Sequence, residues 1–340
     1  MERAPRSWSN IPLELAGLVL GRLHAHVDRV NFAAVCTNWR TAAQKVSLPP
    51  PLPLLALKDG SFYSMPGGEP LRFPGCGDDF VTASGNWLVY KHWNCLLLMN
   101  PFSRATMTLP AVPGNNDNMD FVVVKLVVCS PHLIAALFRG TCRFSIGVCQ
   151  PGASSWSVAQ DLPKQIFDIA FYQEKLYAVN YDEELFALEI NVDDNTGEPH
   201  VALGEKVISG GFLRHDQNFF RVLYLVDTQG LLLMVHRMIA LGQIPREGQI
   251  HTLAEGCEPE LAVFEADIEQ SNVTIVGDDH MLFLGACSRL LDDYKKDEVD
   301  WEPFAGPGGR AVRKFSCPLP KISWRSHYGC AGAMWLFPSN

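Results

Sequence analysis

Histidines, acidic residues and a glycine-rich loop are the groups in this chain whose types and spacing could support catalysis or metal binding. His24 and His26 stand two positions apart, but no cysteine or carboxylate accompanies them at the spacing of a zinc site. The triplet at 278–280 (DDH) precedes an apolar run, as a polar turn before a strand also would. The segment 306–310 (GPGGR) lacks the lysine of a phosphate-binding loop. We therefore expect surface turns here, and neither a metal nor a cofactor.

Three further carboxylates could form a catalytic or ligand-binding site if the fold brought them together. Asp168, Asp227 and Asp267 lie beside turns or at alternating positions of strand-like segments. An enzyme or small-ligand binder acting on a sugar or lactone would need them to converge on one channel. The motifs G-x-S-x-G, H-E-x-x-H and G-x-x-x-x-G-K-[ST] do not occur. The sequence therefore favours a non-catalytic protein, with an enzyme as the alternative.

Composition narrows the class of protein further. The 340 residues are 47% hydrophobic and 19% charged, which is typical of an ordered globular protein. The net charge of −9, without a clustered basic stripe, argues against binding to nucleic acid, because phosphate contacts dominate that affinity. Pro131 divides the longest apolar stretch, 121–138, into two strand-length pieces, so a membrane partner is not expected.

Cysteine use and the N-terminal residues bear on the compartment. The ten cysteines include no C-x-x-C pair, and many lie in apolar strand-like runs. We expect them to be reduced, structural thiols of an intracellular protein. The first ten residues lack the apolar core of a signal peptide, and no clear basic import signal is visible. Cytoplasm and nucleus both remain possible locations.

Residues 1–46 are expected to form a small all-α domain. Pro12 suits the first turn of a helix over the apolar run 11–23. Asp28 is a candidate N-cap for a second helix. Four residues of this second helix share one face at the spacing i, i+3, i+4 and i+7: Phe32, Val35, Cys36 and Trp39.

The proline-rich segment 47–53 must end the second helix. Successive prolines remove backbone donors and favour an extended chain. We interpret this segment as a semi-rigid linker that holds the helices away from the remainder, 54–340. A helical unit of this size cannot bury a helix that is apolar on all sides, so its exposed apolar surface should contact another protein.

From residue 54 the hydrophobic period changes to two, which predicts a mainly β domain. Hairpins are expected at Asp59-Gly60, around 92–94 and across 227–230, and clusters of two to four strands recur at intervals of roughly 40–55 residues. This pattern favours a β-propeller of about six blades, with five or seven also open. A pair of stacked sheets is the alternative architecture. Six tryptophans could line a binding face, but most of them are expected to pack in the core or between blades: Trp87, Trp93, Trp156, Trp301, Trp324 and Trp335.

The N-terminal pattern resembles an F-box. A Leu-Pro-like opening at 11–13 is followed by the ending VCTNWR at 35–40. The resemblance implies that this unit binds a Skp-type adaptor, and through it a cullin scaffold. The residues expected to take part in adaptor binding are Ile11, Pro12, Leu13, Leu15, Leu18, Leu23, Val30, Val35, Cys36 and Trp39. Of these we expect Pro12 and Leu13 to face outward, and the first helix to pack on Val35, Cys36 and Trp39.

The β domain resembles the kelch-like propeller of a large plant family of F-box proteins. The resemblance is carried in order by 100–110 (NPFSRATMTLP), 166–180 (IFDIAFYQEKLYAVN), 222–237 (VLYLVDTQGLLLMVHR) and 327–337 (HYGCAGAMWLF). It implies a substrate-recognition subunit of an SCF-type ubiquitin ligase, whose propeller binds a protein substrate that the sequence does not identify. An F-box scaffold that binds the adaptor without promoting ubiquitylation is a further alternative.

Overall fold

The computed structural model describes most of the chain, and the description below is confined to that part. The described residues are 8–64, 70–113, 122–140, 143–163, 165–211, 219–228, 230–240, 260–275, 281–283, 289–291, 302–305, 311–314 and 333–338. Two of the segments that could do chemistry, 278–280 and 306–310, lie outside these residues.

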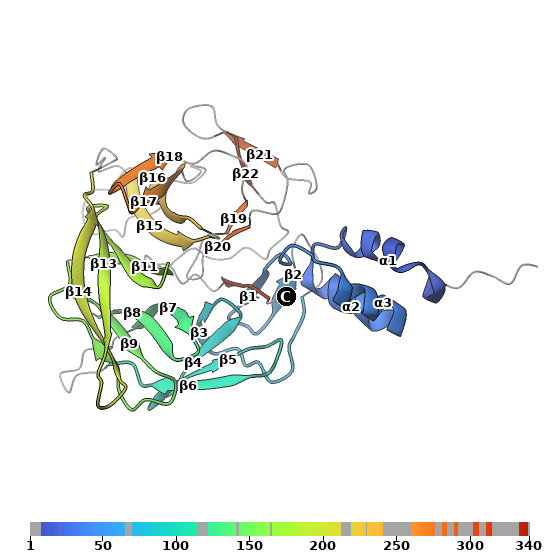
Figure 1. Cartoon of the computed structure of the whole chain (residues 1–340), viewed down its shortest axis with the longest axis horizontal. Helices are drawn as coiled ribbons and strands as arrows, with labels where there is room; N and C mark the ends of the chain where they lie inside the picture. Colours follow the sequence, from blue (N-terminus) through green and yellow to red (C-terminus); the bar gives the residue numbers. More distant parts are fainter. Residues whose placement is uncertain are drawn as a thin grey trace, which may run out of the picture.

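Three short α-helices precede the strands and lie beside the β domain (Figure 1). They follow a 3-10 turn and are arranged as η1 (Trp8–Asn10), α1 (Leu13–Leu20), α2 (His26–Val35) and α3 (Thr37–Lys45). Their common core consists of Ala16, Leu20, Phe32 and Ala42. Gly17 lets α1 approach the segment after α3, because a Cβ at this position would lie 3.0 Å from a Val46 methyl group.

The single helix expected over the stripe from Phe32 to Trp39 is wrong, because Cys36 divides it. Cys36 has an extended backbone (φ −163°, ψ 171°), which ends α2 and begins α3. The break lets Trp39 turn back and stack on Phe32, with 4.5 Å between ring centroids. The Asn38 side-chain amide then donates to the Ile11 carbonyl at 2.9 Å, which ties α3 to the start of α1.

The expected N-cap at Asp28 is also wrong. α2 begins at His26, two residues earlier, so Asp28 lies inside its first turn, and the residue in the N-cap position is Ala25. Ala25 forms a parallel bridge with Leu52 of the linker. This backbone bridge fixes the start of α2. The helix therefore begins at a tertiary contact and not at Asp28, the residue with the better capping side chain.

The proline-rich linker does not hold the helices away from the strands. Pro51, Leu52 and Pro53 are buried, and the Leu52 N–H donates to the His24 carbonyl at 2.9 Å. Arg29 donates through Nη1 to the Pro49 carbonyl at 2.6 Å. The linker is therefore packed between the helices and the β domain, and it joins the two parts firmly.

The strands form small antiparallel sheets arranged around a centre, as the blades of a propeller are (Figure 1). Four sheets have four strands each, in sequence order from the first strand to the last. The first two comprise β3 (Phe80–Ser84), β4 (Trp87–Lys91), β5 (Cys95–Met99) and β6 (Thr106–Pro110), then β7 (Val122–Ser130), β8 (Leu133–Arg139), β9 (Phe144–Cys149) and β10 (Ser157–Val158).

The next two sheets follow the same order. They comprise β11 (Ile166–Tyr172), β12 (Lys175–Asn180), β13 (Leu185–Val192) and β14 (Pro199–Ile208), then β15 (Phe219–Asp227), β16 (Leu232–Ala240), β17 (Glu260–Asp267) and β18 (Asn272–Ile275). Successive first strands are in contact, β3 with β7, β7 with β11 and β11 with β15. This radial succession confirms the mainly β, propeller-like fold and not a pair of stacked sheets.

The ends of the β domain meet in one sheet. β1 (Leu54–Leu57) lies between β2 (Phe62–Ser64) and β23 (Ala333–Leu336), with Leu54 opposite Leu336. Two short pairs complete the described strands: β19 (Met281–Phe283) with β20 (Arg289–Leu291), and β21 (Glu302–Ala305) with β22 (Ala311–Lys314). The expected total of six blades stays a prediction. In the described residues β19–β20 and β21–β22 form separate two-stranded sheets and are not part of a four-stranded blade.

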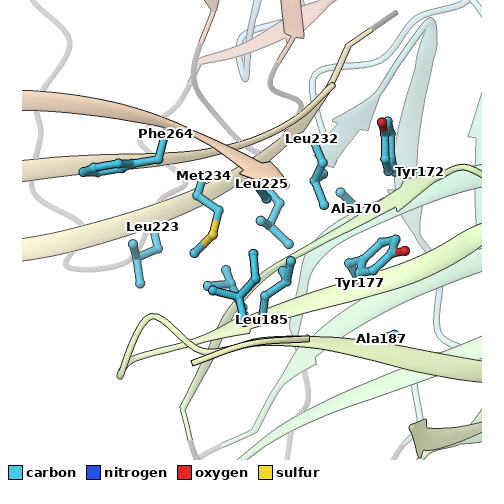
Figure 2. Packing of buried hydrophobic residues seen from close by; sticks show 13 residues of the cluster. Ala170, Tyr172, Tyr177, Leu185, Ala187, Leu223, Leu225, Leu232, Met234 and Phe264 are labelled. Carbon is cyan, nitrogen blue, oxygen red and sulfur yellow. The ribbon is translucent and has the colours of Figure 1, made fainter. Parts of the chain in front are cut away.

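The hydrophobic core lies between neighbouring blades rather than at one centre. One cluster joins the β11–β14 blade to the β15–β18 blade through Tyr177, Leu185, Leu225 and Met234 (Figure 2). Comparable clusters join β3–β6 to β7–β10 and β7–β10 to β11–β14. Each blade is therefore apolar on both faces, which explains strands with nearly continuous apolar runs such as β8.

The pairing of β1 with β23 gives a test of this closure. Leu336→Ala removes a fully buried side chain from the closing sheet, and should lower the free energy of unfolding by about 2–5 kcal/mol. Leu18→Ala is the matched control, because Leu18 is 69% exposed on α1, and its effect should stay within about 0.5 kcal/mol. Denaturant unfolding of the two variants measures both values, and equal effects would contradict the closure.

Candidate functional site

The outward face of α1 is the strongest candidate for a binding surface. Leu15, Leu18 and Val19 occur at i, i+3 and i+4, and their side chains are 51%, 69% and 41% exposed. The opposite face of the same helix places Ala16 and Leu20 in the core of the three-helix unit. The helix therefore has two distinct sides, although its sequence is apolar on both.

The residues predicted for adaptor binding fall into two groups. Pro12, Leu15, Leu18, Val30 and Val35 are exposed. Ile11, Leu13, Leu23 and Trp39 are partly buried and pack against the internal core, and Cys36 is half-buried at the break between α2 and α3.

Two expectations about orientation are wrong. Leu13 packs inward rather than outward, because it lies on the side of α1 that carries Ala16 and Leu20. Val35 does not support α1, since it is 58% exposed at the end of α2. Trp39 does pack inside the unit, where its indole N–H donates to the Trp8 carbonyl at 3.1 Å. Val19 was missed, although its spacing from Leu15 would have indicated it.

The helical unit is also fixed to the propeller through side chains. The His26 ring packs edge-on against Phe102, with 4.8 Å between centroids, and Val27 packs against the cluster that contains β1 and β3–β4 residues. Burial, followed by the nearby Arg29 charge, lowers the pKa of His26. His26 thus serves as a neutral contact between the two parts of the chain. In the described residues no three His, Cys, Asp or Glu side chains form a cluster suited to a metal ion.

The three aspartates considered for catalysis do not converge. Asp168 is buried on the first strand of its blade, whereas Asp227 is exposed at the end of β15. Asp267 ends β17, the third strand of its blade, and accepts a hydrogen bond from the Gln270 N–H at 3.0 Å. The arrangement that a sugar- or lactone-active enzyme would need is therefore absent from these residues.

Asp168 instead takes part in a buried ion pair between blades. Lys125 on β7 lies 2.8 Å from Asp168 on β11, and the Leu225 N–H on β15 donates to the same carboxylate at 2.8 Å. Lys125 also donates to the Leu225 carbonyl at 3.2 Å. Burial raises the pKa of Asp168, and the Lys125 ammonium and two backbone N–H groups oppose that rise. Three consecutive blades are joined at this point.

A second polar cluster lies between the β11–β14 and β15–β18 blades. Glu183, in the β12–β13 turn, pairs with Arg221 on β15 at 2.8 Å, and both side chains are buried. His236 on β16 is 1% exposed, with its Nδ1 3.7 Å from the same Glu183 oxygen. Neither ring nitrogen of His236 has a hydrogen-bond partner among the described residues. Burial and the Arg221 charge lower the pKa of His236 to about 4.

This cluster was not foreseen from the sequence. Nothing local in the sequence indicates that the Glu183 side chain pairs with Arg221, 38 residues later. Glu183 also adopts a positive φ of 65°, which is uncommon for a residue with a side chain. The Asn180 side chain, whose Oδ1 accepts hydrogen bonds from the Asp182 and Glu184 N–H groups, and the buried pair with Arg221 hold the turn together.

Other candidates from the sequence are placed as follows. Trp156 is buried and donates to the Pro110 carbonyl at 3.1 Å, and Trp87 is half-buried, whereas Trp93 is 91% exposed on the β4–β5 turn. The five described cysteines, at positions 36, 76, 95, 129 and 149, are free thiols. None of the helices in the described part of the chain has the length and apolarity needed to cross a bilayer.

Comparison with protein families agrees with the arrangement of blades. The family described as the KIB1-4 beta-propeller matches residues 54–296, which begin at β1 and cover most of the chain. The chain belongs to this family. A comparison with curated proteins gives no match. KIB1-4 propellers are typically found in F-box proteins, and no catalytic activity is known for the domain family. The match does not include the three helices, so their F-box character stays a prediction.

The buried pair in this KIB1-4 propeller can be tested by removing one partner. Lys125→Met should destabilise the fold by about 3–5 kcal/mol, because it leaves the Asp168 carboxylate buried without its cation. Adding Asp168→Asn should recover part of the loss, since an uncharged amide can still accept a backbone hydrogen bond. Lys206→Met, in the exposed pair with Glu184, should cost no more than about 1 kcal/mol. Denaturant unfolding of the three variants measures the change in the free energy of unfolding for each.

His236 predicts a pH dependence of stability. The unfolded chain takes up a proton at the ordinary histidine pKa of 6.5, whereas folded His236 does so only near 4. The unfolded state therefore binds more protons between these values, so stability falls as pH falls, by about 3 kcal/mol over this interval. His236→Gln should flatten this part of the stability curve. Unfolding measured from pH 7 to pH 4 would contradict the assignment if the two slopes were equal.

Proposed function

We propose that this chain is the substrate-recognition subunit of a cullin-based, SCF-type ubiquitin ligase. The helices would bind a Skp-type adaptor, and the propeller would bind the protein substrate. The resemblance of the N-terminal pattern to an F-box supports the first part of the proposal, and membership of a propeller family typically found in F-box proteins supports it further. Cytoplasm and nucleus both suit this function.

The distribution of exposed apolar side chains is the observation that carries the proposal. Six of the ten large hydrophobic side chains that are exposed in the described residues lie between positions 8 and 35: Trp8, Leu15, Leu18, Val19, Val30 and Val35. This density is high for a unit of about forty residues, and such surfaces typically bind other proteins. Partners are therefore expected to be proteins, and neither nucleic acid nor membrane.

The firm junction between helices and propeller fits the same function. Leu52, Arg29 and His26 hold the helical unit against the blades through backbone, side-chain and ring contacts. A receptor of this kind must hold its partner at a set position relative to the adaptor, and a packed linker meets that need better than a flexible one.

Adaptor binding can be tested at the α1 surface. Leu15→Ala with Leu18→Ala should weaken binding of a purified Skp-type adaptor at least tenfold, about 1.4 kcal/mol, because both side chains would be buried on binding. Calorimetric titration of the full chain measures the affinity. Trp39→Ala is unsuitable as an interface probe, since Trp39 packs inside the unit.

Val192→Ala is the matched control for this experiment. Val192 is 60% exposed on β13 of the propeller, far along the chain from the helices, so adaptor affinity should not change. Failure of the intact chain to bind the adaptor, or equal binding after removal of residues 1–47, would overturn the proposal. Adaptor binding without ubiquitylation of a captured partner in cells would instead favour the scaffold function.

A further inference from the structure

The exposed apolar side chains of the propeller gather at one kind of turn. Of the ten large hydrophobic side chains that are exposed in the described residues, four lie on the propeller: Trp93, Val122, Tyr181 and Val192. Trp93 is in the β4–β5 turn and Tyr181 in the β12–β13 turn, whereas Val122 pairs with Arg139, the residue that ends β8 before the β8–β9 turn. Each turn joins the second and third strands of its blade, in three consecutive blades. We call these three turns, together with Val122, the turn surface.

The three turns lie at a common end of the blades, because corresponding turns of neighbouring blades meet. The Tyr172 hydroxyl at the end of β11 donates to the Gly230 carbonyl in the β15–β16 turn at 2.7 Å. The Gln150 side-chain amide after β9 donates to the Gly197 carbonyl in the β13–β14 turn at 2.6 Å. Consecutive blades therefore have the same orientation, and the turns between second and third strands lie at the opposite end from these contacts.

The helical unit is attached at the other end of the blades from the turn surface. His26 packs against Phe102 in the β5–β6 turn, whereas Trp93 precedes β5. The five residues of β5 separate these two positions by about 16 Å at the usual rise of a strand. The Phe337 N–H, one residue after β23, donates to the Gly85 carbonyl in the β3–β4 turn, also at the end that carries Phe102. A partner on the turn surface would therefore not compete with the contacts that hold the helices.

The first two turns of the turn surface are basic. Lys91 is exposed at the start of the β4–β5 turn, and at the β8–β9 turn Arg143 is exposed and Arg139 is half-buried. The described residues of these turns, 91–95, 139–140 and 143–144, include no carboxylate. Exposed carboxylates at this end of the blades lie outside the two turns, such as Asp79 before β3 and Asp182 in the β12–β13 turn. Because the whole chain has a net charge of −9, this local positive charge favours an acidic partner.

Contacts within the blades hold the turn surface in place. The Tyr181 ring stacks on Phe167 with 5.8 Å between centroids, and the Arg221 guanidinium lies 4.9 Å from its centre. The β8–β9 turn is closed by a hydrogen bond from the Gly140 N–H to the Arg143 carbonyl at 2.8 Å. Binding to such turns requires little ordering of the backbone, which lowers its entropic cost. Trp, Tyr and Arg are also the residue types that most often dominate the binding energy of an interface.

We propose that the turn surface binds an acidic segment of a partner protein that also carries apolar side chains. The apolar side chains of the segment pack on Trp93 and Val122, and its carboxylates pair with Lys91 and Arg143. The inference deepens the proposed function by naming the end of the propeller and the class of segment that a substrate would present, and in that respect it rests on it. Peptide binding itself requires no adaptor, so the two can fail separately.

The test is fluorescence anisotropy with the full-length chain and a labelled peptide that repeats glutamate, leucine and serine. This peptide should bind, and its affinity should fall as salt is raised. A peptide with glutamine in place of glutamate, and one with serine in place of leucine, should each bind at least tenfold more weakly, because each lacks one of the two kinds of contact. Absence of binding by the first peptide, or equal binding of either control peptide, would overturn the proposal.

Paired variants locate the binding on the propeller. Trp93→Ala with Lys91→Gln should weaken peptide binding about tenfold or more, because the peptide loses one apolar and one charged contact. Val192→Ala with Arg104→Gln is the matched control, since it removes one exposed apolar side chain and one exposed cation at the other end of the blades. Equal losses in the two double variants would overturn the assignment to the turn surface. Melting curves confirm that each variant folds.

Two other occupants of the turn surface are distinguished by further measurements. A labelled single-stranded oligonucleotide of similar length should bind more weakly than the glutamate peptide, because the chain as a whole is acidic. Sedimentation of the full-length chain should show no dimer that Trp93→Ala dissociates. Tighter binding of the oligonucleotide, or a dimer that depends on Trp93, would overturn the proposal of an acidic protein segment.

Discussion

The buried ion pair between Lys125 and Asp168 is the interaction on which the order of the blades most depends. The carboxylate contacts residues of three consecutive first strands, β7, β11 and β15, so none of these blades can shift without leaving a charge unpaired in the interior. The buried pair of Glu183 and Arg221 links the β11–β14 blade to the β15–β18 blade in the same way. Apolar clusters between blades supply most of the stabilisation, and the ion pairs determine which blade positions are allowed.

Much of the β domain was predictable because its strands are local and its turns carry strong signals. Asp59-Gly60 forms the expected hairpin turn, with Gly60 at φ 75°, and the strands around 92–94 and 227–230 pair as expected. Strand periodicity depends on neighbours two residues apart, so it survives without knowledge of the whole fold. The number of blades depends on how sheets meet around the ring, which periodicity does not encode.

The binding surfaces were less predictable, for a physical reason. Leu13 and Leu15 are equally apolar, and only packing against α3 decides that Leu13 turns inward while Leu15 is exposed. Cys36 breaks a stripe that would suit one helix, because the break lets Trp39 reach Phe32. The buried pair of Glu183 and Arg221 joins a turn to a strand 38 residues later, with no local signal for the contact. Such juxtapositions arise only when the sheets assemble.

The pairing of β1 with β23 has a consequence for how the protein is made. During synthesis β1 leaves the ribosome long before its partner at Ala333–Leu336. The helices can form from local contacts as soon as they emerge, and β1 can pair with β2. The other edge of the fully apolar strand Leu54–Leu57 must wait for β23. During that interval β1 is open to pairing with other chains. A nascent chain of this protein should therefore depend on chaperones until β23 has emerged.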